Sequence, residues 1–104
     1  MLSDYLSRQY QTSPIAQGAP GTTLIIPADP IGHGRQIVVK TVVVIQAGAG
    51  TFKFNDGTDD LTGVMDGVTA SGVAGKDIIV PKSRPFRVIS ATAAVNGWVT
   101  WCYL

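Results

Sequence analysis

The sequence predicts an all-β protein, and three features of its composition and pattern lead to this class. All seven acidic residues are Asp and none is Glu, although Glu favours helices and Asp favours caps and turns. Twelve Gly and six Pro accompany many Val, Ile and Thr, which is typical of strands joined by tight turns. Three runs in the last third, at 77–80, 86–89 and 97–103, carry apolar residues at strand spacing. With 104 residues the chain can build one core but not two, so we expect a single-domain sandwich or barrel.

The first 21 residues are expected to lie outside the β body. Leu2, Tyr5 and Leu6 fall at helical spacing, and Ser3 is placed to cap a short helical turn. The stretch 12–21 is rich in Pro, Gly and small residues and is interpreted as a linker. An apolar segment on a linker predicts an arm that binds a neighbour; packing on its own domain, or fraying, are the alternatives. The chain therefore divides into an arm and linker, 1–21, and a β-sandwich domain, 22–104.

Seven runs in the body predict strands, which cover residues 22–26, 36–46, 51–55, 61–65, 77–80, 86–91 and 98–103. The second run is long enough to bend into two strands at Lys40-Thr41. Asn96-Gly97 predicts a hairpin turn, Asn55-Asp56-Gly57 a second turn, and the Gly- and Ala-rich stretch 67–76 a loop. Alternation along these strands places six large apolar side chains in the core: Val42, Val44, Phe52, Phe54, Phe86 and Val88.

The last strand is apolar on both faces. Trp98 points to one side, whereas Val99, Trp101 and Tyr103 point to the other, because side chains alternate along a strand. A single small domain has one interior, so one of these faces needs a second partner. Trp98, Trp101 and Tyr103 are therefore the predicted oligomer interface.

Composition supports association and excludes several functions. Charged residues make up 14% of the chain, against about 25% in an ordinary soluble domain. The net charge of +1 argues against a dedicated nucleic-acid or membrane-surface binder. One Cys allows no internal disulfide, and no apolar run reaches the ~18 residues of a membrane span. The first residues lack the basic and apolar regions of a signal peptide, so we expect a protein made and assembled in a cytoplasm.

The residues that carry chemistry are too few and too scattered to predict an enzyme. His33 lies between two glycines, on backbone that supports a catalytic base poorly, and is interpreted as an exposed loop residue. Cys102 lies inside the last strand and is expected to be a small buried apolar residue. The segment 72–77 lacks the spacing and the following Ser or Thr of a phosphate-binding loop. No catalytic residue and no cofactor is expected.

Two charged clusters remain. Four carboxylates gather between 56 and 66, those of Asp56, Asp59, Asp60 and Asp66. They lack the alternate spacing and the closing Glu of a calcium-binding loop, so a solvated turn is favoured over a cation site. Lys82, Arg84 and Arg87 surround Pro85 in the densest basic segment. This segment is interpreted first as a charged loop that keeps a strand edge soluble and second as a contact for an acidic protein surface.

The chain resembles the small jelly-roll decoration, or cement, proteins of tailed-bacteriophage heads. The resemblance is carried by Gly50-Thr51-Phe52-Lys53-Phe54, by Leu61-Thr62-Gly63 with Met65, and by Gly97-Trp98-Val99-Thr100-Trp101, behind a short N-terminal arm. It implies an antiparallel jelly-roll sandwich, often trimeric, that binds the major capsid protein and reinforces the shell in the virion. On this interpretation Leu2, Tyr5, Leu6, Lys82, Arg84 and Arg87 are the predicted capsid contacts, with no nucleic acid and no membrane as partner.

Two other functions were compared with this one. A carbohydrate- or receptor-binding module of a phage tail or fibre would need exposed aromatics over a groove, for which Tyr5, Trp98, Trp101 and Tyr103 are available. A small cupin-like enzyme would need a cluster of His and acidic metal ligands, and the chain has a single His.

Overall fold

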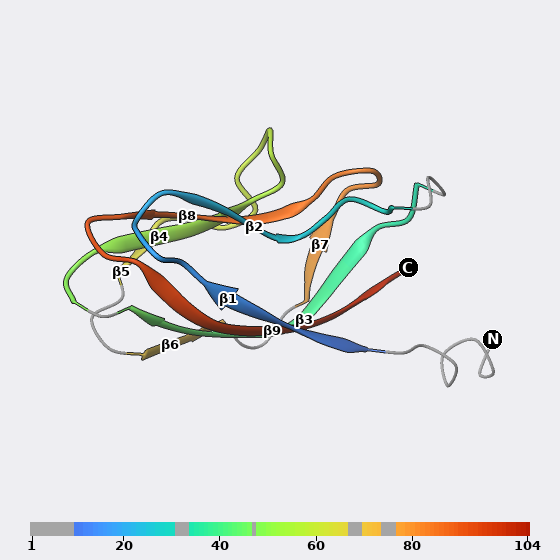
Figure 1. Cartoon of the computed structure of the whole chain (residues 1–104). Helices are drawn as coiled ribbons and strands as arrows, with labels where there is room; N and C mark the ends of the chain where they lie inside the picture. Colours follow the sequence, from blue (N-terminus) through green and yellow to red (C-terminus); the bar gives the residue numbers. More distant parts are fainter. Residues whose placement is uncertain (1–9, 31–33, 47, 67–69, 74–76) are drawn as a thin grey trace.

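The computed structural model describes residues 10–30, 34–46, 48–66, 70–73 and 77–104, of which 70–73 by their backbone alone. These ranges contain nine strands (Figure 1): β1 (Gln11–Ala16), β2 (Thr22–Ile26), β3 (Ile37–Gln46), β4 (Thr51–Asn55), β5 (Met65–Asp66), β6 (Ala70–Val73), β7 (Ile78–Val80), β8 (Phe86–Ala91) and β9 (Val95–Tyr103). No helix long and apolar enough to span a membrane occurs in them.

The strands form two antiparallel sheets that pack face to face as a sandwich. One sheet has the order β1-β9-β3-β6, with β7 also paired to β3, and the other has the order β2-β8-β4-β5. Figure 1 shows them as the lower and upper layers of the molecule. Pairing β1 with β9, β2 with β8, β3 with β6 and β7, and β4 with β5 is what a long antiparallel hairpin gives when it is rolled up. This arrangement is a jelly roll, and the predicted fold class is confirmed.

The core lies between the sheets and is built from alternate residues of their strands. Phe54 stacks on Phe86 with ring centroids 4.9 Å apart, and Phe52 meets Phe54 edge to face at 5.9 Å. Offset-stacked and edge-to-face pairs are the favoured geometries of aromatic rings. All six residues predicted for the core are buried: Val42, Val44, Phe52, Phe54, Phe86 and Val88.

The predicted bend in the long second run is a β-bulge within one continuous strand. The register of β3 against β9 shifts between Val39 and Thr41, so Lys40 is the extra residue. On its other side β3 pairs with β7 through Ile37–Val39 and with β6 through Val42–Ile45. The short strands β6 and β7 therefore lie along the same edge of β3, one on each side of the bulge.

The predicted linker contains a strand. Residues 11–16 form β1 and pair with β9 from Gln11↔Trp101 to Ala16↔Asn96. Ser13, Ile15 and Gln17 point toward the interior, a period-2 pattern that Pro14 disguises in the sequence. Pro14 is tolerated because β1 is an edge strand, whose outward N–H groups need no partner. The β body thus starts at Gln11 rather than at Thr22.

Three other local predictions are wrong. Asn96-Gly97 lies inside β9, and the chain instead reverses at 92–94, where Thr92 adopts a φ of 75°. Only Met65 of the predicted strand 61–65 is in a strand, and the predicted loop 67–76 contains β6. For Gly97 and for β6 the partner strand is β3, which is distant in sequence, and the local glycines gave the opposite signal.

Candidate interaction surface

The two faces of β9 have different roles. Val99 and Trp101 point inward and are buried, and the Trp101 Nε1–H donates to Ser13 Oγ at 2.8 Å. Trp98 points outward from the five-stranded sheet, and 47% of its surface is exposed. Of the predicted interface residues, the structure therefore places Trp101 in the core and leaves Trp98 open.

Tyr103, the third of them, is half-buried and holds the loop that follows β2. Its ring meets Trp101 edge to face at 4.8 Å, and its hydroxyl donates to the Pro27 carbonyl at 2.9 Å. The Arg35 guanidinium lies 4.7 Å from the ring centroid and forms two hydrogen bonds to Asp29, of 3.1 and 3.2 Å. Burial, and then the nearby Asp29 carboxylate, raise the pKa of the Tyr103 hydroxyl above its ordinary value, although Arg35 opposes them.

The outer face of β1, β9 and β3 is apolar around Trp98, and we refer to it as the Trp98 face. Three cross-strand rows build it: Pro14–Trp98–Val43, Ala16–Asn96–Ile45 and Thr12–Thr100–Thr41. Ile45 and, further along the sheet, Ile79 are each exposed to the same extent as Trp98. Lys40, at the bulge next to Thr41, pairs with Asp77 at 3.5 Å.

Gly97 fixes the position of Trp98. The φ of Gly97 is 150°, which L side chains rarely adopt, and a Cβ there would lie 1.9 Å from the Val43 carbonyl oxygen. The absence of a side chain thus lets β9 approach β3 closely beside Trp98. The glycine that suggested a hairpin in the sequence acts in sheet packing instead.

The outer face of the opposite sheet mixes charged and apolar side chains, since the exposed Leu24 of β2 lies beside Arg87 of β8. Lys53 on β4 pairs with Asp60 at 3.0 Å, and Arg87 on β8 donates from Nε to Asn55 Oδ1 at 3.1 Å. The two broad faces of the sandwich therefore differ in chemistry, and the Trp98 face is the one suited to apolar contact.

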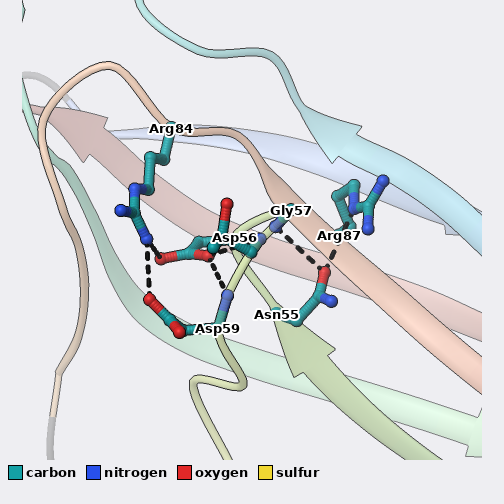
Figure 2. Close-up of polar contacts among 7 residues, drawn as sticks. Asn55, Asp56, Gly57, Asp59, Arg84 and Arg87 are labelled. Carbon is teal, nitrogen blue, oxygen red and sulfur yellow. Dashed lines mark hydrogen bonds and ion pairs between the residues drawn. The ribbon is translucent and has the colours of Figure 1, made fainter.

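Arg84 of the predicted basic contact is engaged within the chain. One of its nitrogens, Nη1, donates to Asp56 Oδ2 and to Asp59 Oδ2, both at 2.9 Å (Figure 2). Lys82 is exposed and forms no ion pair with the described residues. Arg84 is therefore held by two carboxylates of the chain itself, and Arg87 contacts Asn55 as described above.

Asp56 is the centre of the acidic turn, and its carboxylate is buried. Its Oδ1 accepts hydrogen bonds from the amides of Thr58 at 2.9 Å and Asp59 at 2.7 Å. Burial alone would raise the pKa of Asp56, but these two amides and the Arg84 guanidinium outweigh it and hold the pKa below its ordinary value. The guanidinium thus occupies the position where a cation had been considered, and the described residues contain no group of His, Cys, Asp and Glu able to hold a metal.

This turn predicts acid sensitivity. Because the pKa of Asp56 is lower in the folded chain than the ~3.9 of an unfolded one, its contribution is complete above that value and is lost as pH falls through the folded pKa. The urea midpoint of the wild type should therefore decline below about pH 4. Asp56→Asn should lower the midpoint at pH 7 and flatten the decline. Parallel curves for the two proteins from pH 7 to 2 would contradict this role of Asp56.

The remaining predicted residues are placed as follows. Cys102 is buried in β9, as expected for a small apolar residue. His33, and the predicted arm residues Leu2, Tyr5 and Leu6, lie outside the described residues. The segment 72–77 that resembles a phosphate loop lies partly outside them as well.

No family model matches this chain, and no curated protein matches it. One similar solved structure is a cryo-EM structure of a virus-like particle of extra small virus from the giant freshwater prawn Macrobrachium rosenbergii. It has a TM-score of 0.44 and 12% sequence identity, and the match covers 90% of this chain and 77% of that chain. The function of the present chain is accordingly argued from its own surface.

Proposed function

We propose that this chain is a virion structural protein that decorates a tailed-bacteriophage capsid, binds the major capsid protein and stabilises the shell without catalysis. The observation that carries the proposal is the Trp98 face. The core of the sandwich is filled by its own side chains, yet a second apolar surface with an aromatic centre remains on the outside. Exposed apolar surfaces of this kind mark sites of protein association.

The mechanism is mechanical. A homo-oligomer, a trimer by resemblance to the decoration proteins, seats over junctions between capsid subunits and adds buried area across them. An interface of standard size buries ~1,600 Å² in total, with aromatic side chains near its centre. Repeated over a shell assembled in the host cytoplasm, such contacts slow the loss of subunits.

Salt is expected to weaken this attachment only modestly. Because Arg84 is paired with Asp56 and Asp59, it offers little charge to an acidic capsid surface. Exposed ion pairs contribute only ~0.2–1 kcal/mol each and are screened by salt. Lys82 and the arm residues Leu2, Tyr5 and Leu6 remain in the proposal as capsid contacts, with the apolar contribution dominant.

The structure gives little support to the alternative function of a carbohydrate- or receptor-binding module. It requires several aromatic side chains exposed over a groove, and Trp101 is buried while Tyr103 is held by Arg35 and Pro27. Among the described aromatic residues, the exposed ones are Tyr10 and Trp98.

Co-sedimentation tests the proposal directly. The chain is mixed with shells assembled from the major capsid protein encoded beside it, and we expect saturable binding that weakens less than about tenfold between 50 and 500 mM NaCl. Lys82→Ala should change affinity by less than threefold, whereas deletion of residues 1–9 should weaken binding and leave the circular dichroism spectrum of the β body unchanged. A chain that stays in the supernatant at every salt concentration would overturn the capsid role.

A further inference from the structure

We propose that the Trp98 face binds the Trp98 face of another copy of this chain, a partner that rests on the proposed assembly role and makes it specific. In a trimer, each copy would turn this face toward the common axis, where one part of the face contacts a different part of the next copy's face. The shell contacts would then be those already proposed, Leu2, Tyr5 and Leu6 of the arm together with Lys82. Three properties of the described residues select a second copy as the occupant.

The first property is that two of the edge strands, β1 and β2, are poor sites for strand addition, which favours association through the faces. The edge strand β1 carries Pro14, which lacks the N–H that an added strand would need. The edge strand β2 is interrupted by a register shift between Leu24 and Ile26. A partner that uses side-chain contacts on a broad face avoids both obstacles.

The second property is that the Trp98 face is complementary to itself. Its apolar members are Pro14, Ala16, Val43, Ile45 and Trp98. Its polar members in the three rows are threonine hydroxyls and the Asn96 amide, groups that both donate and accept hydrogen bonds. When two copies of this surface meet, no like charges repel each other. Each hydroxyl or amide can find a hydrogen-bond partner, because each of these groups can donate and accept. An acidic or basic partner would find no opposite charge in these rows.

The third property is that the opposite face cannot serve in this way. It carries Lys53 and Arg87, and pairing it with another copy would bring like charges together and desolvate them.

Sedimentation velocity over a concentration series tests whether a second copy of the chain binds the Trp98 face. The wild type should show a species heavier than one 10.9 kDa chain. Trp98→Glu should weaken association by ~100-fold or more, because it places a charge at the centre of a desolvated contact. Leu24→Glu, at an exposed apolar residue of the other sheet, is the matched control and should change association by less than threefold. Ile45→Glu repeats the test on the same face should Trp98→Glu fail to fold by circular dichroism.

The outcomes separate this inference from the proposed function. A wild-type chain that stays monomeric at millimolar concentration, or oligomers that survive both Trp98→Glu and Ile45→Glu, would overturn the second copy as occupant. If such a chain co-sediments with shells, the capsid role stands and the Trp98 face is assigned to the shell. Oligomers abolished by Trp98→Glu in a chain that ignores shells would support the copy–copy contact and reject the capsid role.

Discussion

Gly97→Ala is expected to lower the free energy of unfolding by more than about 4 kcal/mol, a large fraction of the ~5–15 kcal/mol that stabilises a native domain. The added Cβ would lie 1.9 Å from the Val43 carbonyl oxygen and 2.8 Å from its carbonyl carbon. Both are backbone atoms of the neighbouring strand, so the overlap cannot be relieved by a rotamer change. The φ of 150° adds strain for any residue with a side chain.

Gly63→Ala is the matched control, because a Cβ at Gly63 meets no atom within 4 Å. It should change stability by less than about 1 kcal/mol. Urea unfolding followed by near-ultraviolet circular dichroism, which reports on Trp98 and Trp101, distinguishes the two variants. A Gly97→Ala protein with the same midpoint as Gly63→Ala would mean that β9 and β3 do not pair in this register.

The parts of the fold that could be predicted from the sequence are those with strong local signals. Strands β2, β4 and β8 match their predicted bounds, because β4 and β8 alternate large apolar residues with others and β2 is a short β-branched and apolar run between clear turns. The Phe52, Phe54 and Phe86 cluster followed from the same alternation. A bulky residue at every second position identifies a buried face whatever the partner strand is.

The parts that could not be predicted depend on partners far away in the chain. Strand β1 contains Pro14 and small residues, and it is a strand because its partner β9 lies about 85 positions later. Gly97 has the same explanation. Its local sequence is typical of a turn, but a glycine is needed there because the backbone of Val43, in the distant strand β3, lies too close for a side chain. A signal for β1 was present in the alternation of Ser13, Ile15 and Gln17, which Pro14 obscured.

The candidate surface was predicted in part for a related reason. Alternation in β9 separated Trp98 from Trp101 correctly, but it could not say which side was the interior. The placement of Val99 and Trp101 in the core answers that question and leaves Trp98 outside. The ion pairs of Arg84 could not be predicted, because its partners are residues 25 and 28 positions earlier, which no local pattern reveals.

Gln17 was missed as a structural residue, and it makes four side-chain hydrogen bonds at one end of the sandwich. Its Oε1 accepts from Ser90 Oγ at 2.6 Å and from the Val95 amide at 3.0 Å. Its Nε2 donates to the Gly21 carbonyl at 2.9 Å and to Thr23 Oγ1 at 3.1 Å. The side chain is buried, so it joins the connection between β1 and β2 to β8 and to the start of β9 where water cannot replace it.

Gln17→Leu is therefore expected to destabilise the fold by about 3 kcal/mol, although leucine matches the size of glutamine and is more apolar. The substitution leaves the Val95 N–H and the Ser90 hydroxyl without their acceptor, and a buried orphaned group costs about 1–3 kcal/mol. For a domain of this size the melting temperature should fall by about 15 °C. Gln11→Leu places the same change on an exposed residue of β1, the strand that precedes Gln17, and should shift stability by no more than about 0.5 kcal/mol. Equal melting temperatures for the two variants would show that Gln17 is hydrated in solution and that the sandwich is closed at this end by its apolar residues alone.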